Sequence, residues 1–508
     1  MYIFDNDKIW LATGENRIYL EPSMANRHGL IAGATGTGKT VTLKVIAESF
    51  SEMGVPVFIS DVKGDVSGMC VEGEENKHIK RSIETMGIER FRYRSYPVRF
   101  FDVYGEKGHP VRATVSDMGP ELISRILGLN ETQSGVLRIV FRVADDRELL
   151  LLDLKDLRSM LRFVADNADE FRLRYGNITP QSVGAIQRAL LTLEDDGGNV
   201  FFGEPMLDIS DWFSTDEDGF GVMNILECQR LAQHPLLYGT FLLWMLSELY
   251  EYLPEYGDAD RPKIAFFFDE AHMLFRDAPK ALTEKVEQVV RLIRSKGVSV
   301  WFITQNPADI PETVLGQLGS RVQHALHAYT PNEQKGLRYA ARSFRENPAF
   351  RTETVLQELG VGEALVSVLD EKGVPTVVEK ANILPPRSSM KAADDESIAE
   401  RIENSPLKEK YSETLDRESA YELLTEEEKE KIAAKEEEER KKEEEKQKEA
   451  EAKQKEKEEK QKEKEAKKKS SKKQTSFAGK MVSSAANTVG REFGKSLFRG
   501  ILGVLKRN

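Results

Sequence analysis

The sequence predicts an α/β protein with a mainly parallel sheet, and three features of its 508 residues lead to this expectation. A glycine-rich loop at 33–40 separates an expected strand at 28–32 from an expected helix at 39–53. Short apolar segments then alternate with helical segments, and two of the apolar segments end in acidic residues. Strand, loop, helix and strand in this order form a βαβ unit, whose strands are parallel.

The first half of the chain supplies strands and a block of helices. Two short strands are expected within residues 1–20, around a turn at 14–16. Further strands are expected at 55–61 and 98–104. From about 120 to 195, apolar residues recur at helical spacing. We interpret this stretch as a helical insertion that lies on or beside the sheet.

The second half is expected to complete the sheet. The expected elements are a strand at 221–227, a buried helix at 236–246, a strand at 263–272, a helix at 280–296, a strand at 298–305 and a last strand pair that ends near residue 370. The apolar run of the buried helix is too short to span a bilayer. With two distant cysteines and no secretion signal at the N-terminus, the sequence predicts a cytoplasmic protein.

Composition divides the chain into five parts. We expect a short β segment at 1–26, a core at 27–385, a linker at 386–424, a Lys/Glu-rich tail at 425–473 and a basic amphipathic segment at 474–508. The tail cannot bury a core, and both a solvated single helix and a disordered coil remain open for it. It lacks the apolar stripe of a coiled coil. The terminal segment fits a docking helix for its own core or a neighbour, or a membrane-surface contact.

The charge of the chain limits how it can bind nucleic acid. The net charge is -12, although residues 477–508 carry six Lys or Arg against one Glu and contribute +5. The remaining residues therefore sum to -12 - 5 = -17. Because nucleic-acid binding requires a cationic surface, any contact of the core with DNA is expected to be local, such as a pore or groove.

The loop at 33–40 reads GATGTGKT and matches the phosphate-binding pattern G-x-x-x-x-G-K-[ST]. We assign all of its residues to nucleotide binding: Gly33, Ala34, Thr35, Gly36, Thr37, Gly38, Lys39 and Thr40. Glycines let successive N–H groups point at phosphates, and the following helix adds its positive N-terminal end. Lys39 is expected to neutralise the β- and γ-phosphates, and the Thr40 hydroxyl to bind Mg²⁺. The sequence thus predicts ATP and Mg²⁺ as ligands.

Polar residues at three strand ends complete the predicted site. Asp269 and Glu270 follow an apolar strand, where Asp269 is expected to hold the Mg²⁺ shell and Glu270 to activate water as a general base. Gln305 follows the strand at 298–305 and is expected to sense the γ-phosphate or hold the water. Asp61 ends another strand at the same edge, with contact to nucleotide, neighbour or cargo and a simple turn both left open.

Several segments together resemble the HerA–FtsK group of P-loop motors: HGLIAGATGTGKT, ISDVKGD, FFFDEAH and ITQNP. Over about residues 20–385 the chain is most similar to the bacterial family with a HerA-like helicase C-terminal domain. This resemblance implies a RecA-like core and a homo-oligomer, a ring hexamer with nucleotide between subunits. It carries the roles given above over to Lys39, Thr40, Asp269, Glu270 and Gln305.

The resemblance also implies an arginine finger that reaches into a neighbour's site. Arg294 and Arg321 are the candidates, and Arg188 is a weaker one. The implied function is that of an ATP-hydrolysing motor, a DNA translocase or helicase. Two alternatives remain open: an ATPase acting on a protein or membrane-associated partner, and a nucleotide-gated scaffold. Only about 27 residues precede the first expected core strand, so the N-terminal barrel of HerA-type helicases is expected to be missing or vestigial. The sequence also shows no winged-helix signature like that of FtsK-type motors, so the cargo stays open.

Overall fold

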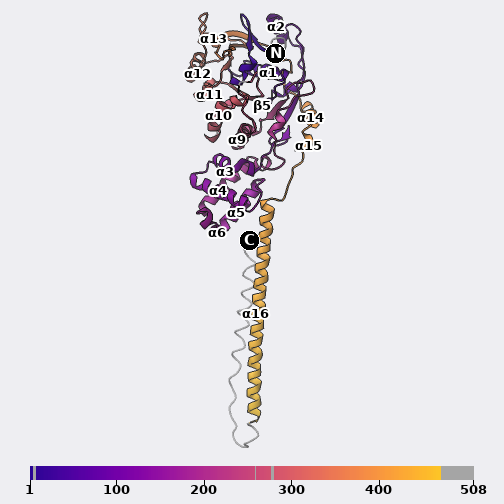
Figure 1. Cartoon of the computed structure of the whole chain (residues 1–508), viewed down its shortest axis with the longest axis vertical. Helices are drawn as coiled ribbons and strands as arrows, with labels where there is room; N and C mark the ends of the chain where they lie inside the picture. The colour runs from indigo at the N-terminus through magenta and orange to yellow at the C-terminus, as the bar shows by residue number, and fades with distance from the viewer. Residues whose placement is uncertain (4–6, 258, 276–279, 471–508) are drawn as a thin grey trace. The chain divides into compact units, whose positions relative to one another are not determined.

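The computed structural model describes residues 1–3, 7–257, 259–275 and 280–470 (Figure 1). The chain separates into two compact units, Met1–Glu427 and Glu428–Asn508. The first unit holds the sheet and the helices packed on it, and the predicted α/β class is confirmed. Among the described residues, no helix combines the length and the apolar character that crossing a bilayer requires.

The described strands form one 13-stranded sheet. In spatial order they are β1 (Tyr2–Ile3), β2 (Lys8–Thr13), β13 (Glu379–Ile383), β12 (Glu363–Ser367), β11 (Ser320–Gln323), β4 (Gly29–Ala32), β10 (Val298–Thr304), β9 (Ile264–Phe268), β5 (Val57–Asp61), β8 (Met223–Glu227), β6 (Val98–Asp102) and β7 (His109–Pro110), while β3 (Arg17–Leu20) pairs with β2. All pairs from β11 through β7 are parallel. The pairs among β1, β2, β3, β13, β12 and β11 are antiparallel.

Strand order brings four carboxyl ends together. β10 lies between β4 and β9, with Thr304 beside Ala32 and Phe302 beside Phe268. β5 lies on the other side of β9, with Ser60 beside Phe268. The loops after β4, β10, β9 and β5 therefore leave the sheet at one edge, where parallel α/β sheets place their ligands.

Helices α1, α3 to α7, α9 and α10 lie where the sequence predicts helices, whereas α2, α8 and α11 to α15 were not predicted, and a helix was one of two alternatives for the tail that contains α16. The helices are α1 (Lys39–Glu52), α2 (Lys77–Met86), α3 (Val115–Ile126), α4 (Glu131–Asp146), α5 (Leu154–Asp166), α6 (Ala168–Tyr175), α7 (Pro180–Asp195), α8 (Gly198–Phe201), α9 (Pro235–Tyr252), α10 (Lys280–Leu292), α11 (Glu312–Leu315), α12 (Pro331–Arg342), α13 (Thr352–Glu358), α14 (Asp395–Glu403), α15 (Lys408–Tyr411) and α16 (Ala420–Ser470).

Two apolar layers cover the parallel strands. On β5, Val57 and Ile59 join the core that contains residues of α1, whereas Phe58 joins the core that contains residues of α9. Every residue of β5 is buried. This pattern is typical of a parallel strand with both faces covered. The 18-residue helix α9, which the sequence places in the interior, is largely buried in the second layer.

The helical insertion is present where the sequence predicts it, as helices α3 to α7, and Figure 1 shows α3 to α6 gathered as a group. Helices α3, α4, α5 and α7 begin at polar residues whose side chains cap them. Asn130 and Asp153 form capping boxes with the third residue of α4 and of α5. Thr179 caps α7, whose first residue is Pro180. Such caps satisfy N–H groups that a helix leaves unpaired at its start.

Residues 386–424, which composition suggests as a linker, pack against the core. Leu407, Tyr411, Ala420 and Leu424 are buried in the layer that contains α9. Tyr411 is fully buried, and its hydroxyl donates to Asp211. A few buried apolar side chains are sufficient to hold this polar segment against the core, although they form no periodic pattern in the sequence.

The described part of the Lys/Glu-rich tail is helical. Helix α16 continues to Ser470, and every side chain described from 428 to 464 is exposed. Glu–Lys pairs four residues apart stabilise it, for example Glu437 with Lys441 at 2.8 Å. The amphipathic segment at 474–508 lies outside the described residues.

Candidate nucleotide-binding and catalytic site

The glycine-rich loop joins β4 to α1, as the sequence predicts. Gly33, Gly36 and Gly38 have φ angles of 149°, 79° and 119°. A residue with a side chain is strained in this region of φ, so all three positions favour glycine. Gly38 is also the N-cap of α1. The first N–H groups of α1 lack acceptors within the helix and lie at its positive end, where an anion binds.

His324, which the sequence analysis did not identify, fills the space beneath this loop. The side chain is fully buried after β11, and Nε2 lies 2.8 Å from Oγ1 of Thr42 in α1. A Cβ at Gly33 would lie 2.5 Å from Cβ of His324, and one at Gly38 would lie 3.2 Å from Cε1. The glycines therefore allow the loop to pass directly over this ring.

Lys39 and Thr40 begin α1 and make short polar contacts. Nζ of Lys39 donates to the carbonyl oxygens of Gly33 at 2.7 Å and Ala34 at 3.1 Å, so the ammonium lies within the curve of the loop. Burial and then the charge of Lys63 lower the pKa of Lys39. The Thr40 hydroxyl donates to Oδ2 of Asp65 at 3.0 Å.

The acidic pair lies at the end of β9. Asp269 and Glu270 are 5% and 6% exposed, and Glu270 has a φ of 47°. Left-handed backbone at a residue other than glycine costs free energy and occurs often at functional sites. Burial raises the pKa of Asp269 to about 6. Burial also acts to raise the pKa of Glu270, but the hydrogen bond and charge of Lys63 outweigh it and hold that pKa below its usual value.

Gln305 lies where the sequence predicts, directly after β10 and between the other two strand ends. Its Nε2 donates to both oxygens of Glu270 at 3.4 Å. His272 approaches the same carboxylate, with Nδ1 3.1 Å from Oε2 of Glu270. The amide and the acid are thus adjacent.

The loop after β5 adds two residues that sequence reasoning missed. Nζ of Lys63 lies 2.5 Å from Oε1 of Glu270 and 4.0 Å from Oδ2 of Asp269. Asp65 binds Thr40. Of the interpretations open for Asp61, the structure shows the turn: its oxygens accept from the N–H groups of Gly64 at 2.7 Å and Val66 at 3.0 Å. Asp61 therefore stabilises the turn. Lys63 and Asp65 are the next two charged residues of the same segment, DVKGD, and they are the ones that contact the site.

The finger candidates lie away from the acidic pair of their own chain. Arg294 precedes β10, at the opposite end of that strand from Gln305. Arg321 donates to the carbonyl oxygens of Leu318, Ser343 and Leu315, at 3.3, 2.6 and 3.0 Å. Arg188 is exposed in α7 of the insertion. The charged groups that the structure brings together at the site are lysines and carboxylates.

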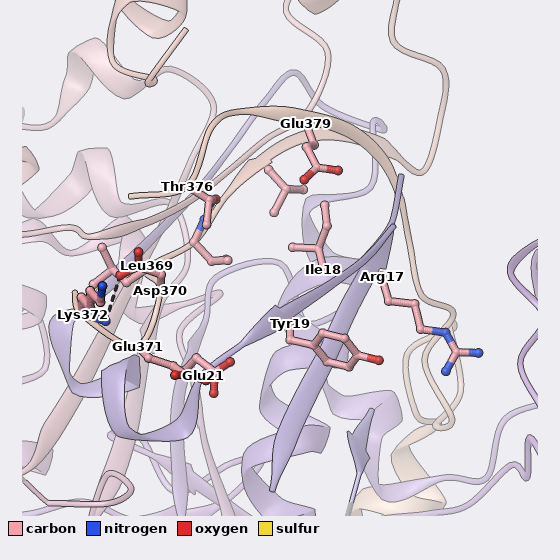
Figure 2. A pocket seen from close by; sticks show the side chains of 12 residues that line it. Arg17, Ile18, Tyr19, Glu21, Leu369, Asp370, Glu371, Lys372, Thr376 and Glu379 are labelled. Carbon is pink, nitrogen blue, oxygen red and sulfur yellow. Dashed lines mark hydrogen bonds between the residues drawn. The ribbon is translucent and has the colours of Figure 1, made fainter. Parts of the chain in front are cut away.

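A further depression of about 390 Å³ lies between β3 and the segment 366–379 (Figure 2). Its charged side chains are engaged with groups nearby. Lys8 pairs with Glu21 at 2.7 Å and with Glu371 at 3.4 Å. Asp370 accepts from the N–H groups of Lys372 and Val374, both at 2.9 Å. None of the residues that line this depression belongs to the glycine-rich loop.

A phosphate loop at the end of one parallel strand and an acidic pair two strands away define the class of P-loop NTPases. The family follows from the sequence: residues 7–508 match the family described as Helicase HerA-like C-terminal. Since the match spans nearly the whole chain, the chain belongs to this family, and the resemblance stated above is confirmed. A comparison with curated proteins finds no match.

Several solved structures have limited similarity to this chain, at low identity and with TM-scores below 0.5. Plasmid coupling protein TrwB with the ATP analogue ADPNP has a TM-score of 0.49 and 16% identity, over 76% of this chain and 92% of TrwB. TrwB with ADP and Mg²⁺ has a TM-score of 0.46 and 15% identity, over 75% of this chain and 91% of TrwB. VirB4 of Thermoanaerobacter pseudethanolicus has a TM-score of 0.47 and 15% identity, over 75% of this chain and 98% of VirB4. At these TM-scores, conclusions about function depend on the family and the site.

Proposed function

We propose that this protein hydrolyses Mg·ATP and uses the reaction to move DNA through an oligomeric ring. The observation that carries the proposal is the arrangement of the site. Glu270 is held by Lys63 and Gln305 at the same sheet edge as the phosphate loop. Membership of the HerA-like helicase family supports an ATP-driven motor.

The residues present fit Mg²⁺ and a nucleoside triphosphate. The positive-φ glycines leave the loop backbone free to approach phosphates closely. The Thr40 hydroxyl donates a hydrogen bond to Asp65, which leaves the lone pairs of the hydroxyl oxygen available to a cation. Oδ1 of Asp65 is buried without a hydrogen-bond partner. A buried oxygen of this kind suits a water bound to Mg²⁺, which keeps several waters in proteins.

Each residue has a defined task in the proposed reaction. Lys39 binds the β- and γ-phosphates in place of the loop carbonyls, and Thr40 and Asp269 hold the metal. When bound, Mg²⁺ supplies charge stabilisation on the phosphates. Glu270 accepts the proton of the attacking water, and Gln305 orients that water beside Glu270. The pKa of Glu270 is held below its usual value, so its carboxylate is ionised at neutral pH.

Membership of the family supports the proposed ring and DNA cargo. A neighbouring subunit would supply a positive charge to the γ-phosphate, with Arg294, Arg321 and, less strongly, Arg188 as candidates. Since the net charge is -12, DNA would contact a limited basic surface, such as the lining of a ring.

The steady-state ATPase rate, measured with and without single- and double-stranded DNA at two salt concentrations, tests the proposal. Strong stimulation by DNA that fades at high salt is expected, because phosphate contacts release counterions. An ATPase rate that DNA does not change would support the ATPase activity but reject DNA as the cargo, in favour of a protein or membrane partner. ATP-dependent assembly that retains its effect when Glu270→Gln abolishes hydrolysis would instead favour a nucleotide-gated scaffold.

A further inference from the structure

The loop that follows β5, residues 62–66, reaches two separate parts of the site. Lys63 contacts the Glu270 carboxylate, which belongs to the end of β9. Asp65, two residues later, contacts the Thr40 hydroxyl, which belongs to α1. One short loop therefore bridges the proposed base and a proposed metal ligand, and β5 itself lies next to β9 in the sheet.

The backbone of this loop is fixed from several sides. Both Asp61 oxygens accept its N–H groups, from Gly64 at 2.7 Å and Val66 at 3.0 Å. Nε2 of Gln229 donates to the carbonyl of Lys63 at 2.6 Å. Gly64 has a φ of 79°, and a Cβ there would lie 2.5 Å from Nε2 of Gln229. These contacts hold the backbone of the loop in one defined conformation.

The contacts of Lys63 and Asp65 differ from those of surface ion pairs. The Glu270 side chain is 7% exposed, so the hydrogen bond from Lys63 restricts a carboxylate that is almost fully shielded from water. Asp65 accepts from Thr40 through Oδ2, while Oδ1 remains buried without a partner. Groups that hydrogen-bond the ligands of a metal or a catalytic side chain fix their orientation.

The geometry points to the loop 62–66 as a positioning element of the ATPase site, in which Lys63 orients the Glu270 carboxylate and Asp65 orients the Thr40 hydroxyl. This inference rests on the proposed ATPase function. Lys63 and Asp65 are positioning residues, because each acts through another side chain.

Lys63 is tested with Lys63→Gln and Lys63→Arg in the full-length protein, with Lys391→Gln as a matched control. Lys391 pairs with Glu74 at 3.8 Å on the surface, and both side chains are more than four-fifths exposed. In Lys63→Gln, kcat for Mg·ATP is expected to fall about 10-fold or more, as loss of an orienting partner typically causes. KM and the Kd of a fluorescent ATP analogue should stay within about twofold, since binding is not its task. Lys63→Arg, which keeps the cation, should restore most of kcat.

Results of two kinds would overturn the role of Lys63. One is a wild-type kcat in Lys63→Gln, or a Lys63→Arg protein as impaired as Lys63→Gln. The other is loss of nucleotide affinity in parallel with kcat, which would indicate a ligand contact or a folding defect rather than orientation. Lys391→Gln should match wild type throughout.

Asp65 is tested by binding rather than by turnover. In Asp65→Asn, the Mg²⁺ concentration that half-maximally strengthens binding of the ATP analogue should rise about 10-fold. Binding in EDTA should be unchanged, and Asp395→Asn, an exposed surface control, should behave as wild type. An unchanged Mg²⁺ titration, or equal loss of binding in EDTA, would overturn this role. A wild-type protein with no Mg·ATP turnover would instead reject the ATPase proposal itself, so the two failures are distinguishable.

Discussion

Nε2 of His324 lies 2.8 Å from Oγ1 of Thr42, which joins the end of β11 to the helix that follows the phosphate loop. Nδ1 of the same ring lies 3.0 Å from the carbonyl oxygen of Glu363. Because a carbonyl only accepts, Nδ1 carries the proton and Nε2 accepts from the Thr42 hydroxyl. The ring thus connects α1 to β12 directly beneath Gly33 and Gly38. It supports the phosphate loop from below.

His324→Ala should therefore weaken both the fold and nucleotide binding. The substitution removes the hydrogen bonds that the ring makes with the Glu363 carbonyl and the Thr42 hydroxyl, and a buried polar group left unsatisfied costs about 1–3 kcal/mol. The loop above also loses its support, so the Kd of an ATP analogue should rise. Urea unfolding and equilibrium binding measure the two effects. His327→Ala, at an exposed histidine nearby, should change neither; a stable His324→Ala protein with wild-type affinity would show that the ring does not support the loop.

The same histidine should make stability depend on pH. Burial lowers the pKa of His324 from 6.5 to about 4. Between these values the unfolded chain takes up a proton that the folded chain does not, so the contribution of His324 to stability is lost as pH falls. The difference in unfolding free energy between wild type and His324→Ala should be constant above about pH 7 and shrink by about 1.4 kcal/mol per pH unit from 6.5 toward 4. Urea titrations at several pH values measure it, and a difference that stays constant would contradict the buried neutral ring.

Local patterns in the sequence predicted those parts of the site that come from a single segment of the chain. The phosphate loop, the acidic pair and Gln305 all follow apolar strands, and the structure places each at a strand end. The contacts of His324 with Thr42 and of Lys63 with Glu270 depend on which strands are neighbours. Hydrophobic periodicity gives no strand order, so these partners became visible only with the sheet.

The roles of the charged residues at the end of β5 and in the loop after it could not be predicted from the sequence either. Asp61 is the last residue of β5 and was therefore prominent in the sequence, but its oxygens hold the following turn. Lys63 and Asp65 are loop residues, which have no periodic signal. Their contacts with Glu270 and Thr40 depend on the conformation of the turn, which includes Gly64 at a positive φ.

Two truncations should separate the core from the tail. A chain that ends at Glu427 should keep wild-type nucleotide affinity and a similar melting temperature, because side chains described from 428 to 464 are all exposed. A chain that ends at 406 loses Leu407, Tyr411 and Leu424 from the interior. At about 1.5–3 kcal/mol for each large buried apolar side chain, its unfolding free energy should fall by several kcal/mol. Thermal unfolding of both proteins checks this, and equal stabilities would show that 407–424 is not part of the core.

Substitutions at Lys39 and Glu270 should separate binding from hydrolysis. Lys39→Ala removes the ammonium that lies within the phosphate loop, so it should abolish binding of ATP and its turnover. Glu270→Gln keeps the shape of the side chain but cannot accept a proton. It should bind ATP normally and lower kcat about 10²–10⁴-fold, the usual contribution of a general base. Equilibrium binding and steady-state kinetics distinguish them, and wild-type turnover by both variants would reject the mechanism.

Arg294 should act on the site of a neighbouring subunit if it is the finger. It lies before β10, at the opposite end of that strand from Gln305, so it does not reach its own acidic pair. Arg294→Ala and Lys39→Ala should each be inactive alone. When the two are mixed in equal amounts, a site with intact Lys39 meets an intact Arg294 at about a quarter of the interfaces of a head-to-tail ring. The mixture should recover ATPase activity to that extent, whereas Lys39→Ala mixed with Glu270→Gln should recover none because both variants are defective in the site itself. A mixture as inactive as its components would exclude Arg294 and leave Arg321 or Arg188, tested in the same way.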